Sequence, residues 1–141
     1  MDPWERQRAL GRTTIGWSTV SIAGGLVCAA RQDRWWRAFG QQHVGWGVVD
    51  LLIVAVAARL QSRRMRRLPN PYDPVAMQRE QRTLRDVLLG NVVADAGYVV
   101  TGAALCSRKD PRASGAGAAI MLQGLFLLLH DAHHAHGSRP G

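Results

Sequence analysis

The sequence predicts an all-α integral membrane four-helix bundle, and three observations support this fold class. First, four long stretches are nearly free of charge: residues 13–30 and 113–130 contain no Asp, Glu, Lys or Arg, 38–58 contains only Asp50, and 87–107 contains only Asp95. Second, each has the roughly 17–25 residues that a helix needs to cross a bilayer. Third, none keeps a charged face at a 3.6-residue period, which a helix of a soluble bundle would need.

The elements follow in chain order as a single membrane domain. Asp2-Pro3 predicts a helix start, and the Arg-rich turn beside Trp4 is expected at the cytoplasmic interface. The predicted spans cover residues 13–30, 38–58, about 85–107, and 113–131. Residues 59–84 form the predicted linker, with prolines at 69, 71 and 74. Asp73-Pro74 then predicts the start of a helix that continues into the third span.

The positive charge sorts by loop, although a net charge of +8 could also indicate nucleic-acid binding. Twelve of the 18 Arg and Lys residues, Arg139 among them, fall in the termini and the linker. Positive-inside bias therefore places both termini and the linker in the cytoplasm, in the cell (inner) membrane. No nucleic-acid partner is needed to explain these charges. A cluster in the linker suits anionic lipid headgroups: Arg63, Arg64, Arg66 and Arg67.

Each predicted span carries a stripe of polar or small residues on one helix face. His43, Gly47 and Asp50 recur at i, i+4 and i+7 in the second span. Small and polar residues let membrane helices approach closely, so we expect these stripes to face one another and not lipid. The remaining stripes are Ser18, Ser21, Gly25 and Cys28 in the first span; Asn91, Asp95, Tyr98 and Gly102 in the third; and Gln123 and His130 in the fourth.

Asp50 and Asp95 are the strongest candidates for a functional site, because a carboxylate inside a bilayer is costly. Counted from the span ends, both fall in one midplane layer with Ser21 and Gln123. One interpretation is a ligand- or proton-accessible pocket, in which two neighbouring carboxylates do not both ionise readily. The other is a hydrogen-bond network that holds the helices together. The flanking candidates are Asn91 and His130 toward the cytoplasm, and His43 and Tyr98 toward the outside.

Two further residue pairs leave alternatives open. His130 and His134 are spaced i, i+4, as in a metal-chelating pair, or they belong to a solvated interfacial tail. Cys28 and Cys106 each end an outward-running span near the oxidising face. They form either a disulfide or two thiols that pack as small hydrophobic side chains. No cofactor is indicated, because the chain has no phosphate loop, zinc signature or nucleophile motif.

A twofold repeat is visible in the spacing of small residues. Gly24 and Cys28 recur at Gly102 and Cys106, at an offset of 78. Gly40 and Gly47 recur at Gly117 and Gly124, at an offset of 77. Each half would be an outward helix, a basic turn and an inward helix, which makes two parallel hairpin repeats. Chance placement of small residues is the alternative.

Part of the chain resembles a known protein family. Residues 78–81 (QREQ) lead into 90–98 (GNVVADAGY), and residues 117–131 read GAAIMLQGLFLLLHD. These motifs resemble a family of small four-helix bacterial membrane proteins known only as a domain of unknown function. The likeness covers roughly residues 16–131 and is best in the second half. It implies a four-span fold and no known activity.

The sequence favours a role in binding or transporting a small or lipophilic ligand, or a proton, around Asp50 and Asp95. Four spans are few for a transport path, so transport would require a homo-oligomer. A non-catalytic small subunit or scaffold of a larger membrane complex is the first alternative. An intramembrane enzyme acting on a quinone or a lipid is the second.

Overall fold

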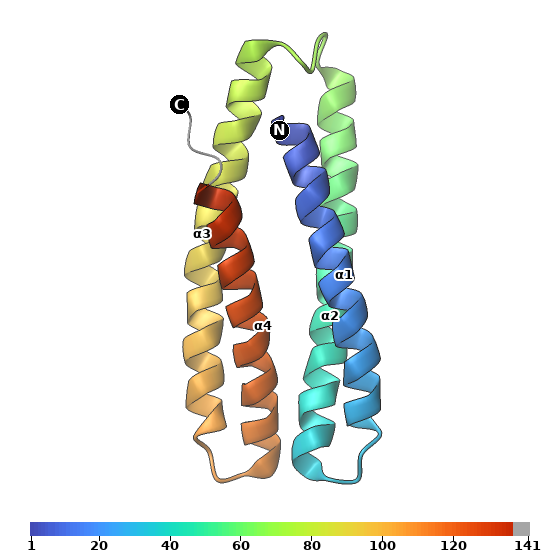
Figure 1. The fold of residues 1–141 in the computed structure, drawn as a ribbon, viewed down its shortest axis with the longest axis vertical. Coiled ribbons are helices and arrows are strands. Elements are labelled where there is room, and N and C mark those ends of the chain that lie inside the picture. The colour runs from blue at the N-terminus through green and yellow to red at the C-terminus, as the bar shows by residue number, and fades with distance from the viewer. Residues whose placement is uncertain (137–141) are drawn as a thin grey trace.

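Four helices form two hairpins that lie side by side (Figure 1). The computed structural model describes residues 1–136, so Arg139 lies outside the described residues. The helices are α1 (Pro3–Ala29), α2 (Arg34–Arg67), α3 (Pro74–Cys106) and α4 (Pro111–His136). The predicted all-α four-helix architecture is confirmed. The start of α1 and the end of α4 lie toward the same end of the molecule as the α2–α3 loop (Figure 1).

Aspartates cap the starts of three helices. The Asp2 carboxylate accepts a hydrogen bond from the Glu5 backbone N–H at 2.7 Å, and Asp33 and Asp73 accept from the first turns of α2 and α3. These bonds satisfy N–H groups that have no partner inside a helix. The helix starts predicted at Asp2 and Asp73 are confirmed.

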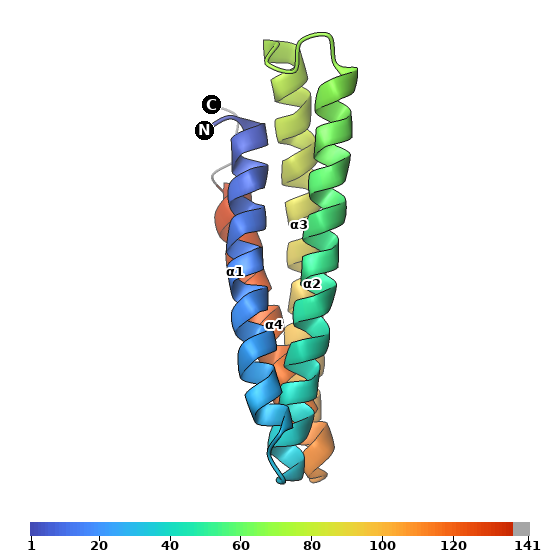
Figure 2. The ribbon, with the colours of Figure 1, turned by 90° about the vertical axis from the view of Figure 1, so that its right-hand side faces the viewer.

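The predicted linker is mostly helical. α2 continues to Arg67 and α3 begins at Pro74, which leaves only residues 68–73 outside a helix. Both helices therefore project beyond the ends of α1 and α4 and are joined there by the loop (Figures 1 and 2).

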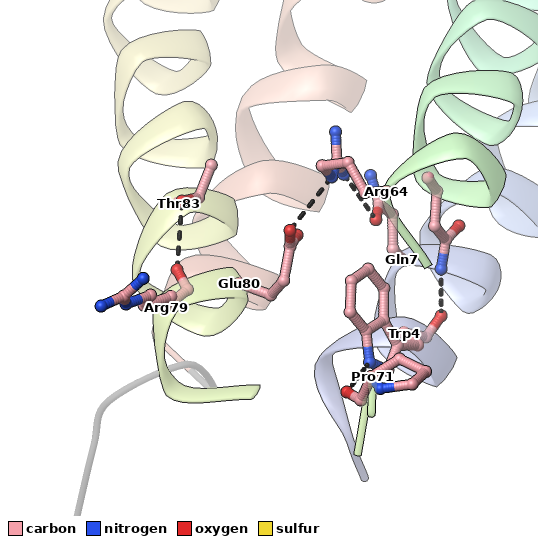
Figure 3. A network of polar contacts seen from close by, with 8 residues as sticks. Trp4, Gln7, Arg64, Pro71, Arg79, Glu80 and Thr83 are labelled. Carbon is pink, nitrogen blue, oxygen red and sulfur yellow. Dashed lines mark hydrogen bonds and ion pairs between the residues drawn. The ribbon is translucent and has the colours of Figure 1, made fainter. Parts of the chain in front are cut away.

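Trp4 ties the start of α1 to this projecting end (Figure 3). Its indole N–H donates to the Pro71 carbonyl at 2.9 Å, and its own carbonyl accepts from the Gln61 amide at 2.9 Å. Beside it, Arg64 pairs with Glu80 at 3.1 Å and so joins α2 to α3. Trp4 is fully buried, so it does not lie at a lipid interface as its position in an Arg-rich turn suggested.

The pattern of burial is inverted relative to that of a water-soluble bundle. Large aliphatic side chains point outward: Val93 is 74% exposed and Leu129 is 64% exposed. The polar stripes point inward, and the buried polar side chains include Ser18, Ser21, His43, Asp50, Asp95 and Gln123. An apolar exterior of this size indicates a lipid environment. Asn91 and Tyr98, which belong to the predicted stripe of the third span, are exposed, so the expectation that the stripes face the interior holds for the buried residues named above and not for these two.

Three helices are long and apolar enough to cross a membrane: α2, α3 and α4. By length and composition the protein is therefore a multi-pass membrane protein. Within the described residues α1 is not one of the three, although the sequence predicted four spans.

Glycines bring the helices of each hairpin into backbone contact. A Cβ on Gly25 would lie 2.8 Å from the Gly40 carbonyl oxygen, and one on Gly117 would lie 2.7 Å from that of Gly102. The two contacts correspond to each other at an offset of 77 residues. Helices inside a membrane pack in this way, because the hydrophobic effect does not drive them together in lipid and small residues allow close van der Waals contact instead.

The same offset relates further contacts, so the two hairpins are structural repeats. Gly47 packs against Ser18 and Ile22, and Gly124 packs against Asp95 and Val99 in the other hairpin, all 77 positions on. Gly24, in contrast, faces open space. The offset of 78 suggested by Gly24 and Gly102 was therefore wrong, because Gly25 is the residue equivalent to Gly102.

We expect Gly102→Ala to destabilise the α3–α4 hairpin. The new methyl group would lie 2.7 Å from the Met121 Cα, and backbone cannot move aside cheaply. The cost should be about 1–3 kcal/mol, as for other overpacked sites. Thermal unfolding of the purified protein in detergent would measure it.

Gly97→Ala on the same helix is the matched control. A Cβ there meets nothing within 4 Å, so the better helix propensity of Ala should leave stability unchanged or raise it by about 0.5–1 kcal/mol. Equal melting temperatures for the two variants would contradict the glycine contact.

Candidate intramembrane ligand site

A cavity of ≈ 560 Å³ lies between the two hairpins. All four helices line it, and most of its wall is aliphatic. Its size falls within the range of small-molecule sites in proteins, about 300–1,000 Å³. Polar or aromatic side chains in the lining include Gln7, Arg8, Arg12, Trp46, Asp50, Gln61, Asn91, Asp95, Tyr98, His130 and Asp131.

Asp50 belongs to a hydrogen-bond chain that crosses three helices. The Gln123 amide on α4 donates to the Asp50 carboxylate on α2 at 2.5 Å. The Gln123 carbonyl oxygen accepts from the Trp17 indole on α1 at 2.7 Å. Both ends of the Gln123 amide are thus used, which holds α4 between α1 and α2. Asp50 therefore combines a packing role with a place in the cavity wall.

Asp95 is equally buried but lacks such support. It is 4% exposed, and its Oδ2 atom has no hydrogen-bond partner among the described residues. Asn91 and Tyr98 lie on the same helix and line the same cavity. The Tyr98 ring meets the edge of Trp46 on α2, with centroids 5.0 Å apart. The structure thus brings Asp95, Asn91 and Tyr98 to one wall without joining Asp95 Oδ2 to its neighbours.

His130 lines the cavity from α4, next to Asp131. Its Nδ1 atom lies 3.0 Å from the Asp131 carboxylate, and its Nε2 atom has no partner among the described residues. With Nδ1 donating to the Asp131 carboxylate, Nε2 is an acceptor when the ring is neutral and a donor when the ring is protonated. The His130 ring also stacks on Phe126, with centroids 5.6 Å apart.

His43 stands apart from the cavity. It is buried, but its ring contacts Phe39 at a centroid distance of 4.5 Å and the edge of Trp17 at 6.5 Å. It does not line the cavity. His43 is thus outside the cavity lining, as Gln123 is, and Trp17 contacts both of these residues.

The structure also places the two pairs predicted for metal binding and for a disulfide. The rings of His130 and His134 have centroids 4.9 Å apart. No group of three or more His, Cys, Asp or Glu side chains suited to a metal ion occurs in residues 1–136. Cys28 and Cys106 are free thiols, and Cys106 contacts Ser114 within its own hairpin.

Three site residues were not anticipated: Trp17, Trp46 and Asp131. A signal was present for the two tryptophans, since Trp17 precedes Ser21 by one helical turn and Trp46 precedes Asp50 by one turn. Asp131 directly follows His130, at the predicted end of the fourth span. It is buried and lines the cavity.

The length and apolar composition of its helices define a multi-pass membrane protein, and a largely apolar cavity with a few polar side chains lies between the two hairpins. The chain belongs to the family of unknown function DUF6992, whose family model matches residues 13–132. The likeness noted in the sequence to a membrane-protein family of unknown function is thereby confirmed. No curated protein and no solved structure matches the chain.

We expect Gln123→Met to destabilise the protein, because it leaves the Trp17 N–H and the Asp50 carboxylate unpaired. Each orphaned buried group should cost about 1–3 kcal/mol. Thermal unfolding in detergent would measure the loss. Asp50→Asn is the control, since its amide oxygen can still accept from Gln123. If Gln123→Met unfolds no earlier than Asp50→Asn, the chain does not hold the helices together.

Proposed function

We propose that the protein binds a small lipophilic ligand inside the membrane, in the cavity between the two hairpins. The cavity itself is the observation that carries this proposal. Binding sites in proteins are mostly apolar, with a few polar groups that fix the ligand's orientation. This one offers Asp95, Asn91, Tyr98 and His130 as polar groups in an aliphatic wall. Transport of the ligand, or of a proton with it, would use the same residues and would call for a homo-oligomer.

The proposed orientation places both termini and the α2–α3 loop in the cytoplasm of the cell (inner) membrane. The start of α1, the end of α4 and the α2–α3 loop lie toward one end of the molecule (Figure 1). The terminal segments and the predicted linker carry most of the arginines, as the positive-inside rule requires. We also propose that α1 crosses the bilayer. It packs along α2, and residues 13–30 carry no charge.

Anionic lipid headgroups are the proposed partners of an arginine-rich groove on α2. Arg59, Arg63, Arg66 and Arg67 line it together with Ser62. Juxtamembrane basic residues each contribute about 1 kcal/mol of attraction to an anionic membrane surface. Arg64 is not part of this groove, because it turns toward Glu80 and Gln7 instead.

A cavity-filling variant tests the ligand proposal. Ala94 lines the cavity, so Ala94→Phe should occupy ligand space, whereas Val93→Phe changes a residue that is 74% exposed on the outer surface. We expect Ala94→Phe to weaken ligand binding at least about tenfold, a loss of roughly 1.4 kcal/mol, and Val93→Phe to leave it unchanged.

The measurement is quenching of tryptophan fluorescence by bromododecanol in protein-containing nanodiscs. Trp46 lines the cavity, so Trp46→Phe defines the signal that arises there. Saturable quenching that Ala94→Phe alone abolishes would support the site. Equal quenching in Ala94→Phe and Val93→Phe would count against a ligand cavity and favour the scaffold alternative.

Cysteine labelling tests the proposed topology. In a variant without Cys28 and Cys106, single substitutions Ser62→Cys and Ser107→Cys place thiols at exposed positions at opposite ends of the bundle. A membrane-impermeant maleimide should react in intact cells with the variant at position 107 and not with that at 62. The opposite result would reverse the orientation.

A further inference from the structure

We propose that the ligand of this cavity is a lipophilic amine, an apolar body with one protonated amino group held by Asp95 and His130. This inference rests on the proposed function and names the chemical class of its ligand. It starts from two buried polar atoms of the cavity-lining residues, Asp95 Oδ2 and His130 Nε2, which have no partner within the described residues.

Both unpartnered atoms can accept a hydrogen bond. An ionised carboxylate oxygen accepts, and when His130 is neutral with Nδ1 donating to Asp131 at 3.0 Å, its Nε2 atom accepts. A single partner for both atoms must then be a donor with more than one hydrogen. A primary ammonium group has three N–H bonds, so it can serve both atoms and donate the third to the Asn91 side-chain oxygen, which borders the same cavity. A quinone carbonyl could not fill this role, since it only accepts.

The charges around the site favour a cation. α2 contributes Asp50, α3 contributes Asp95, and α4 contributes Asp131 with His130. Gln123 donates to Asp50, and His130 donates to Asp131. Asp95 Oδ2 is a buried carboxylate oxygen that has no such partner among the described residues, and an unpaired buried charge is strongly destabilising without a counter-ion.

Two arginines of α1, Arg8 and Arg12, lie at a different height along the bundle from Asp95. Leu10 packs beside Leu88, and Asp95 lies seven residues deeper along α3, about 10 Å at 1.5 Å per residue. Arg8 and Arg12 flank Leu10 on α1 and are exposed, so their Cα atoms lie at least about 7 Å along the bundle from that of Asp95. Neither of them donates a hydrogen bond to Asp95 Oδ2, which has no partner among the described residues.

The rest of the lining suits an organic cation better than a metal ion. In residues 1–136 no three His, Cys, Asp or Glu side chains are grouped as metal ligands. The lining is aliphatic over Leu10, Ile53, Leu88 and Leu127, which fits a hydrocarbon body.

Displacement of bromododecanol by three dodecyl compounds tests this inference in nanodiscs of uncharged lipid. Dodecylamine carries charge and N–H donors, dodecanol has one neutral donor, and dodecyltrimethylammonium has charge without a donor. We expect dodecylamine to displace the probe at concentrations at least about tenfold lower than either of the other two, which corresponds to one charge-assisted hydrogen bond.

Asp95→Asn should abolish the advantage of the amine over the alcohol while bromododecanol still binds. Asp86→Asn removes the same charge from an exposed position on α3 and should keep the advantage. His130→Phe preserves stacking on Phe126 but removes the Nε2 acceptor, so it should reduce the advantage even if Asp95→Asn fails to fold.

Two results would overturn the inference. One is equal displacement by dodecylamine and dodecanol in the native protein. The other is an amine advantage that survives in both Asp95→Asn and His130→Phe. Either leaves the cavity in place as a site for a neutral ligand, whereas loss of bromododecanol quenching in the native protein would remove the proposed function itself.

Discussion

Backbone contact at glycines is the constraint on which the rest of this structure depends. Lipid is as apolar as the outer side chains, so hydrophobic burial does not drive these helices together, and packing must do so. Gly25 meets Gly40, and Gly102 meets Gly117, which fixes the spacing of each hairpin. These contacts lie toward the α1–α2 and α3–α4 turns, whereas the residues that line the cavity lie farther from those turns.

The repeat explains why the polar residues do not pair symmetrically. Asp95 occupies the position equivalent to Ser18, 77 residues earlier, so only one hairpin carries a carboxylate there. The Ser18 hydroxyl donates a hydrogen bond to the Thr14 carbonyl of its own helix. An ionised Asp95 carboxylate cannot make the equivalent bond, because it has no hydrogen to donate. Two hairpins with the same backbone packing have thus acquired different chemistry, and the cavity lies where they differ. This combination of a shared scaffold and a local exception is typical of a functional site.

Much of the site was visible in the sequence as a set of residues but not as a set of contacts. Helical periodicity identified Asp50, Asp95 and Gln123 as inward-facing, because side-chain direction within one helix follows from its 3.6-residue repeat. Periodicity could not show that the Gln123 amide donates to Asp50, or that Asp95 Oδ2 has no hydrogen-bond partner among the described residues. That choice depends on the rotation and height of α4 relative to α2, which are set between helices.

The sequence by itself determined the number of helices, their approximate ends, the membrane setting and the inward faces, because each of these depends on local composition and spacing. Only the tertiary structure decided the repeat offset of 77, the burial of Trp4, the separation of His43 from the cavity, and the pairing of His130 with Asp131. These features join residues that lie far apart in the chain or that differ by one position on a helix. A shift of one residue rotates a side chain by about 100°, so only the packed structure distinguishes Gly25 from Gly24.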